Sequence, residues 1–142
     1  MKRVFSVILA VMLFVTCCGG TALAANEIEP YASPTLAYYD VELLVGDSRG
    51  MLWIDFDVTA SKLADSVGIK EIKIYKSNGT YVTTITGTTS NGLVLNNNNL
   101  HVGTYEYKGI SGTSYYAEVT VFATVGSITD SRTVTTSTEE AP

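Results

Sequence analysis

The sequence predicts an all-β fold, a β-sandwich of about seven antiparallel strands. Three observations carry this prediction: short segments in which apolar and polar residues alternate, turn residues between those segments, and no convincing helical periodicity. The alternation is clearest over residues 52–58, where apolar residues take every second position and Trp53, Asp55 and Asp57 lie between them. One face of such a strand packs into a core and the other faces solvent, which is typical of antiparallel sheets.

The other strands are expected in order along the chain, at 38–45, 69–76, 80–86, 102–107, 115–125 and 128–136. In the first of them the side predicted to face inward carries Tyr39, Val41, Leu43 and Val45. In 115–125 the alternation is longest, and it predicts that Tyr115 faces inward while Tyr116 and Phe122 face outward.

Asn78-Gly79 lies between two of these strands and predicts a β-hairpin with a type I′ turn, because both residues accept a positive φ. In the returning strand, 80–86, Val82 and Ile85 cannot share a face without a bulge, so this strand is predicted to be an edge. Asn78, Gly79 and Thr80 also form an N-glycosylation sequon, but the hairpin already accounts for them.

Two polar segments are predicted to be loops. Residues 61–68 form the first, with one possible helical turn because Leu63 and Val67 are four apart. The second is 87–100, which ends in the run Asn96–Asn99. It could be a ligand-facing loop or a solvated turn tract, and the second interpretation is favoured because asparagine closes its own turns.

The N-terminus predicts a secretory signal peptide over residues 1–24. Lys2 and Arg3 form a basic start, an apolar run follows over 4–18, and the small-residue pattern ending at Ala24 marks the expected cleavage site. The expected product is secreted. Two alternatives keep it at the membrane: an uncleaved anchor, or lipidation at Cys17 or Cys18, although neither cysteine follows the small residue of a lipobox.

After cleavage the chain is expected to comprise a leader linker (25–35), one domain (36–136) and a polar tail (137–142). Loss of Lys2 and Arg3 leaves seven basic against 14 acidic side chains, a formal charge of −7. This charge disfavours nucleic acid and anionic membranes as partners. No later apolar run approaches the roughly 20 residues of a membrane-spanning helix.

The segment Gly112-Thr113-Ser114-Tyr115-Tyr116-Ala117-Glu118-Val119-Thr120-Val121-Phe122-Ala123 resembles the penultimate strand of fibronectin type III and related Ig-like domains. The resemblance implies an Ig-like Greek-key sandwich in which Tyr115 is the tyrosine corner, its hydroxyl bonded to the backbone just upstream. Trp53 falls out of phase with the inward tryptophan of the type III pattern, so Ig-like is the better description. The layout is also similar to short, uncharacterised secreted proteins of Gram-positive anaerobic bacteria, which carry no known activity to transfer.

Catalysis is not expected. His101 is the only histidine, and it is predicted to lie at the surface or rim. Gly46-Asp47-Ser48-Arg49-Gly50 has the letters Gly-x-Ser-x-Gly but is predicted to be a turn between two strands, whereas a nucleophile elbow joins a strand to a helix. No cofactor is predicted. Asp55 and Asp57 point to one face, and with Asp40 and Glu42 they could hold Ca²⁺. The favoured interpretation is a solvated acidic face whose cross-strand partners are Lys70, Lys73 or Lys76.

Outward-facing aromatic residues are the best functional lead: Trp53, Tyr75, Tyr116 and Phe122. Such residues stack on sugar rings or anchor a protein partner. The alternatives are that a loop or the leader covers them, or that they form cross-strand pairs. The sequence therefore predicts a secreted, non-enzymatic binding module for a surface protein or glycan. The second hypothesis is a structural protein that self-associates through the edge 80–86, and an enzyme is third.

Overall fold

The computed structural model describes residues 33–142, which form seven strands and no helix. The strands are β1 (Leu36–Val45), β2 (Met51–Lys76), β3 (Tyr81–Thr86), β4 (Val94–Lys108), β5 (Ser114–Val125), β6 (Ile128–Thr135) and β7 (Glu139–Glu140). The predicted signal peptide, its cleavage site at Ala24, Cys17, Cys18 and the leader up to residue 32 lie outside the described residues. The all-β prediction is confirmed for the described part of the chain.

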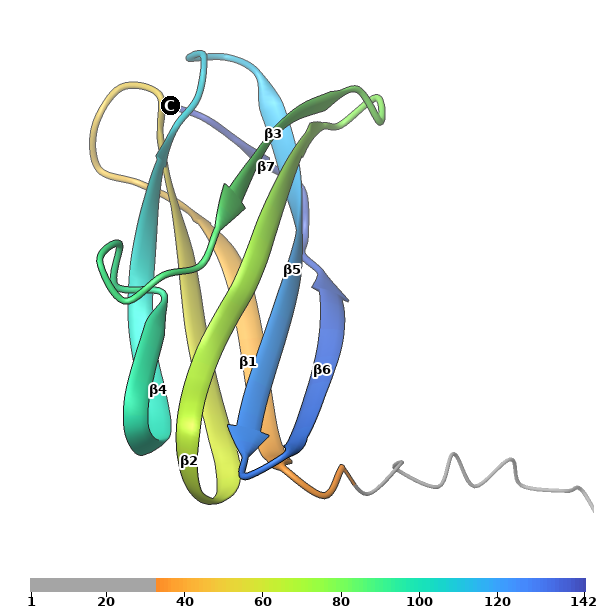
Figure 1. Cartoon of the computed structure of the whole chain (residues 1–142). Helices are drawn as coiled ribbons and strands as arrows, with labels where there is room; N and C mark the ends of the chain where they lie inside the picture. The colour runs from red at the N-terminus through yellow and green to blue at the C-terminus, as the bar shows by residue number, and fades with distance from the viewer. Residues whose placement is uncertain (1–32) are drawn as a thin grey trace, which may run out of the picture. The chain divides into compact units, whose positions relative to one another are not determined.

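The long strand β2 organises the sheet, and every pairing in it is antiparallel. Figure 1 shows β2 turning back on itself, so that it has a first arm (51–60) and a second arm (66–76). The first arm pairs with β1 and with the later part of β4. The second arm pairs with β3 and β5 and, at residues 66–68, with the start of β4. β6 extends the sheet beyond β5. The arrangement is consistent with a β-sandwich.

Both arms send alternate side chains into one core. The predicted inward residues of 52–58 and of 115–123 are buried. In β1 the prediction holds for Val41 and Leu43 but is wrong for Tyr39 and Val45, which are 38% and 47% exposed. Because the arms share a core, their outward residues lie on opposite surfaces. We call the outer side of β1, the first arm and β4 the acidic face, and the outer side of β3, the second arm, β5 and β6 the tyrosine face.

The first predicted loop is strand throughout, and the second is strand from Val94 onward, whereas residues 87–93 form turns as predicted. Residues 61–68 continue β2 and pair with β4, for example through Ala64 opposite Asn98. The asparagine run likewise belongs to β4, where Asn97 adopts a φ of 51°. Gly68 has a φ of 141°, and a Cβ there would overlap the carbonyl oxygen of Leu93. Polar, exposed residues therefore form strand here because distant backbone supplies their hydrogen bonds.

The predicted hairpin between β2 and β3 is confirmed, but its turn type is wrong. Only Gly79 has a positive φ (83°), whereas a type I′ turn requires one at Asn78 too. The Gly79 amide donates to the Lys76 carbonyl (2.8 Å), and the Lys76 amide donates to the Thr80 carbonyl (2.9 Å). The predicted irregularity of β3 is present, since the register shifts by one residue at Val82.

The two ends of the described chain are joined to the sheet. Glu139 and Glu140 of the expected polar tail form β7 beside β5, and Ala141 is fully buried. At the other end, Thr35 is buried, and its amide donates to the Asp130 carboxylate in β6 (2.9 Å). Polar composition alone does not reveal these contacts, because their partners lie far away in the chain.

The Asp130 carboxylate also accepts a hydrogen bond from the Ser33 hydroxyl (2.6 Å), and these two bonds hold the pKa of Asp130 below its usual range. Since the folded-state pKa is lower than the unfolded value of about 3.9, Asp130 stabilises the fold above about pH 4. That contribution is lost as the pH falls through the folded-state pKa.

We expect Asp130→Asn to unfold more easily than wild type at pH 7 and to lose less stability than wild type between pH 5 and 3. Urea unfolding at several pH values measures this, with Asp47→Asn, an exposed site, as control. Parallel pH curves for wild type and Asp130→Asn would contradict the prediction.

Candidate functional site

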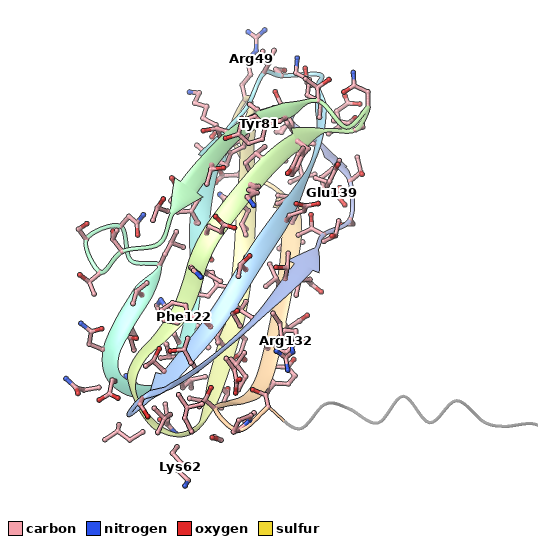
Figure 2. The ribbon with its side chains drawn as sticks, turned by 45° about the vertical axis from the view of Figure 1, so that its right-hand side comes forward. Arg49, Lys62, Tyr81, Phe122, Arg132 and Glu139 are labelled. Atoms are coloured by element: carbon pink, nitrogen blue, oxygen red, sulfur yellow. The ribbon has the colours of Figure 1, made fainter. Side chains whose placement is uncertain are left out.

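The structure does not bring the four predicted aromatic residues together. All four are half-buried, but Trp53 lies on the acidic face, whereas Tyr75, Tyr116 and Phe122 lie on the tyrosine face. Phe122 follows Tyr116 by six residues on β5, which separates them by about 20 Å along the strand. Figure 2 places Phe122 well away from Tyr81, which lies at the Tyr75 end.

Three tyrosines from three adjacent strands form a cluster on the tyrosine face. The Tyr75 and Tyr116 rings are stacked, with centroids 5.2 Å apart and planes inclined by 11°. Tyr81 of β3 packs edge-on against Tyr75 at 5.8 Å and is 55% exposed. We call Tyr75, Tyr81 and Tyr116 the tyrosine cluster. The sequence analysis did not select Tyr81, although the Asn78-Gly79 hairpin brings it back opposite Tyr75.

Hydrogen bonds orient two of these rings. The Tyr75 hydroxyl donates to Glu118 Oε2 (3.2 Å), and the hydroxyls of Tyr81 and Thr84 are hydrogen-bonded at 3.0 Å. Burial, and next the bond to Glu118, raise the pKa of the Tyr75 hydroxyl. Tyr75 therefore remains a neutral donor at physiological pH, and its ring is held in place from both sides.

A charged pair lies beside the cluster on the second arm. Lys73 Nζ is 3.1 Å from Glu71 Oε1, and this contact raises the pKa of Lys73. The pair is solvent-accessible, so it adds little to stability and keeps the neighbouring surface polar. The tyrosine cluster is thus an aromatic patch with a hydrophilic border.

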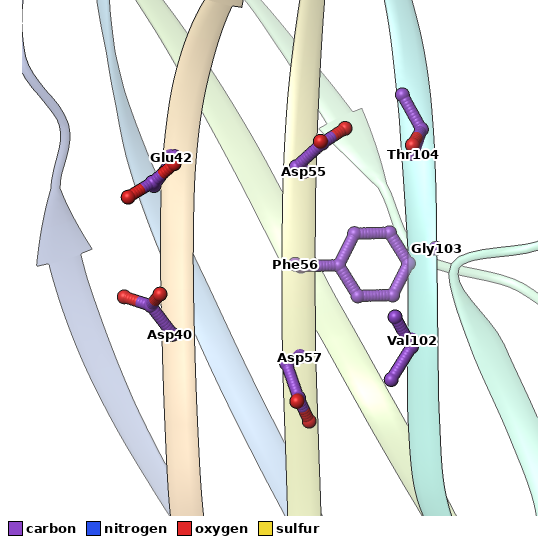
Figure 3. A pocket seen from close by; sticks show the side chains of 8 residues that line it. All are labelled: Asp40, Glu42, Asp55, Phe56, Asp57, Val102, Gly103 and Thr104. Atoms are coloured by element: carbon purple, nitrogen blue, oxygen red, sulfur yellow. The ribbon is translucent and has the colours of Figure 1, made fainter.

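The acidic face contains the four carboxylates that the sequence analysis grouped. Asp40 lies opposite Asp57 and Glu42 lies opposite Asp55 across β1 and β2. Figure 3 shows them beside an open groove of about 230 Å³, with Thr104 and Val102 of β4 on its other side. Asp55 Oδ1 is shielded from solvent and has no hydrogen-bond partner among the described residues.

The predicted lysine partners of these acids are wrong. Lys70, Lys73 and Lys76 belong to the second arm of β2, on the opposite side of the core from the acidic face. The prediction failed because it assumed that residues 52–58 and 69–76 lie on the same face of the domain. Within residues 33–142 no group of three or more His, Cys, Asp or Glu side chains is placed to hold a metal ion, and this includes Asp55 and Asp57.

Like charges directly opposite each other destabilise a sheet. We expect Asp57→Asn to raise the free energy of unfolding by about 0.2–1 kcal/mol. The gain should shrink as salt screens the repulsion from Asp40. Denaturant unfolding at low and high salt measures it, and Glu140→Gln, an exposed site in β7, is the control. A destabilised Asp57→Asn would mean that the Thr59 hydroxyl, 3.5 Å from Asp57 Oδ1, stabilises this carboxylate by more than Asp40 repels it.

His101 is buried, which corrects the prediction of a surface or rim position. It is 6% exposed, its Nε2 is 2.9 Å from the Gly92 carbonyl oxygen, and its ring packs against Phe56 at 4.9 Å. Gly68 leaves space for it, since a Cβ there would lie 2.9 Å from His101 Cδ2. The signal was present in the sequence, because His101 shares the alternation of Tyr105 and Tyr107 in β4.

Tyr115 is 2% exposed and lies at the start of β5. Its hydroxyl accepts a hydrogen bond from the backbone N–H of Ile110, five residues upstream, at 3.0 Å. Its ring packs against Tyr107 at 5.7 Å, and Gly109 is tightly placed over it, since a Cβ there would lie 2.7 Å from Tyr115 Cε2. The residue therefore ties the β4–β5 connection to the core.

Among residues 33–142 no helix is long and apolar enough to cross a membrane. Comparison with protein-family models, with curated proteins and with solved structures gives no match to this chain.

Proposed function

We propose that the protein is a secreted, non-enzymatic binding module that contacts a protein or glycan at the cell surface. The observation that carries this proposal is the tyrosine cluster, an aromatic patch on the outer side of a sheet, away from the core. Tyrosine supplies a large contact area with few rotatable bonds, and it is enriched at binding surfaces and energetic hot spots.

The internal hydrogen bonds of the cluster support this role. Tyr75 is held by Glu118 and Tyr81 is held by Thr84, so these rings are ordered before a ligand arrives. Binding normally loses conformational entropy because interface side chains become ordered, and this loss is smaller when the side chains are already ordered in the free protein. The exposed ring of Tyr81 would make the first contact.

We further propose that the domain is an Ig-like Greek-key sandwich. The resemblance of residues 112–123 supports it, as does the bond from Ile110 to the Tyr115 hydroxyl. The signal-peptide pattern of residues 1–24 supports secretion. The core position of His101 supports a non-enzymatic role, because an imidazole engaged with Gly92 and packed on Phe56 does not face an external substrate.

The test is binding of the purified chain, residues 25–142, to a panel of cell-wall polysaccharides and to intact cells. We expect saturable binding to at least one of them, weakened about tenfold or more by Tyr81→Ala combined with Tyr116→Ala. Trp53→Phe, on the opposite surface, should bind as wild type does. Absence of saturable binding, or equal binding by the tyrosine variant, would overturn the proposal. Loss in Trp53→Phe alone would move the site to the acidic face.

Self-association through β3 is the second candidate. The observation that favours it is that β3 pairs only with β2 among the described strands, which leaves one side open to another chain. The bulge at Val82 works against it, since bulges interrupt edge pairing. Oligomer size at rising concentration tests it: assembly should appear in wild type and vanish in Thr83→Pro, while a concentration-independent monomer would exclude it.

A further inference from the structure

An open depression of about 320 Å³ lies at one end of the domain, between the β1–β2 turn and the β4–β5 connection. It is lined by Arg49, Gly50, Lys108, Gly109, Ile110 and Ser111. The lining combines two cationic side chains, the hydroxyl of Ser111 and the apolar side chain of Ile110, which is 66% exposed. None of these six residues has a carboxylate side chain, although the chain as a whole has a net charge of −5, and the Gly50 amide is hydrogen-bonded to the main-chain oxygen of Pro142 (2.6 Å).

Backbone contacts place the two cations together. The Gly109 amide donates to the Gly50 carbonyl (2.8 Å), and Lys108 lies opposite Met51 in the ladder between β4 and β2. Gly50 has a φ of 77°, and a Cβ there would lie 2.7 Å from the Gly109 carbonyl oxygen. Only glycine permits this close approach, so Gly50 sets the distance between the two segments that carry Arg49 and Lys108.

Both cations are available to a ligand. Within the described residues the one ion pair is that of Lys73 with Glu71, so neither Arg49 nor Lys108 has a carboxylate partner. A guanidinium presents paired donors that match the oxygens of an anion, and an ammonium adds a point charge. We propose that this depression binds an anionic group, a carboxylate, sulfate or phosphate, carried by a cell-surface polymer.

This site goes beyond the tyrosine cluster and does not depend on it. Figure 2 shows Arg49 and Tyr81 toward the same end of the domain, with Lys62 at the opposite end. Lys62 and Lys70 are exposed lysines that do not line the depression, so together they form a matched control for the removal of two positive charges. Non-specific attraction of a polyanion would respond equally to either pair.

The experiment titrates residues 25–142 with polygalacturonate, heparin and long-chain polyphosphate at low salt, with dextran as the neutral control. We expect at least one polyanion to bind, more weakly as salt rises, and to shift the amide NMR signals of residues 49–50 and 108–111. Arg49→Gln with Lys108→Gln should weaken binding by about tenfold or more, whereas Lys62→Gln with Lys70→Gln should change it by about twofold at most. The polyanion that binds identifies the anionic group.

Three results would overturn the proposal: no binding by any polyanion, equal binding of dextran, or equal weakening by the two charge-matched variants. The Tyr81→Ala with Tyr116→Ala variant separates this site from the proposed tyrosine surface. It should keep the polyanion affinity of wild type, so failure of one proposal leaves the other measurable.

Discussion

Replacing Tyr115 with alanine is expected to lower the free energy of unfolding by about 3–5 kcal/mol, because it removes a large, fully packed ring from the core. The melting temperature should fall by about 10 °C or more. Tyr115→Phe keeps the ring and removes only the bond from the Ile110 amide, so its expected loss is about 1–2 kcal/mol. Thermal and urea unfolding measure both variants.

Two tyrosines serve as controls for this prediction. Tyr107→Phe alters a neighbouring ring that contacts Tyr115, and the Tyr107 hydroxyl makes no hydrogen bond within residues 33–142, so this variant should be close to wild type. Tyr81→Ala removes an exposed ring and should cost little stability. If Tyr115→Phe were as stable as wild type, the hydroxyl bond would have no role in holding the β4–β5 connection.

Deletion of residues 139–142 is expected to lower the free energy of unfolding by about 2–5 kcal/mol, because several hydrogen bonds are lost at about 1 kcal/mol each. The Gly50 amide donates to the main-chain oxygen of Pro142 (2.6 Å). The Gly112 amide donates to the Ala141 carbonyl (2.8 Å), and the Ala141 amide donates to the Thr113 carbonyl (3.1 Å). Ala141 is also completely buried. If residues 139–142 were instead a free polar tail, their deletion would leave the free energy of unfolding unchanged.

Hydrogen exchange gives a local readout of this deletion. The amides of Gly50 and Gly112 should exchange faster in the truncated chain, while amides in the centre of β5 keep their relative protection. Glu140→Ala, which changes an exposed side chain and leaves the backbone intact, is the control. Unchanged exchange at Gly50 and Gly112 would show that the C-terminal residues do not hold these turns.

Local sequence patterns predicted the parts of the fold that depend on local physics. The alternation of 52–58 and 115–123 identified two core-facing strands, because period-two burial is a property of any strand with one buried face. Asn78-Gly79 predicted the hairpin, although not its turn type, since only Gly79 takes a positive φ. The irregular alternation of 80–86 predicted the bulge that falls at Val82.

The candidate site was only partly predictable. Tyr75 and Tyr116 were identified as outward residues of separate strands, and the register of β2 with β5 makes them neighbours. Tyr81 was missed because it lies at the irregular start of β3, where alternation carries little information. Phe122 and Trp53 were also predicted to face outward. Phe122 does lie on the tyrosine face but far along β5 from the tyrosine cluster, and Trp53 lies on the acidic face.

The sequence by itself determined the all-β class, the inward and outward sides of 52–58 and 115–123, and the position of the hairpin at Asn78-Gly79. Only the tertiary structure decided that residues 61–68 and 96–99 belong to strands and that His101 is in the core. It also decided that Lys73 lies on the tyrosine face and not on the acidic face. The reason is that side-chain alternation is a property of neighbouring residues. Which strands pair, whether a polar residue is buried and whether two charged residues share a face all depend on contacts between segments far apart in the chain.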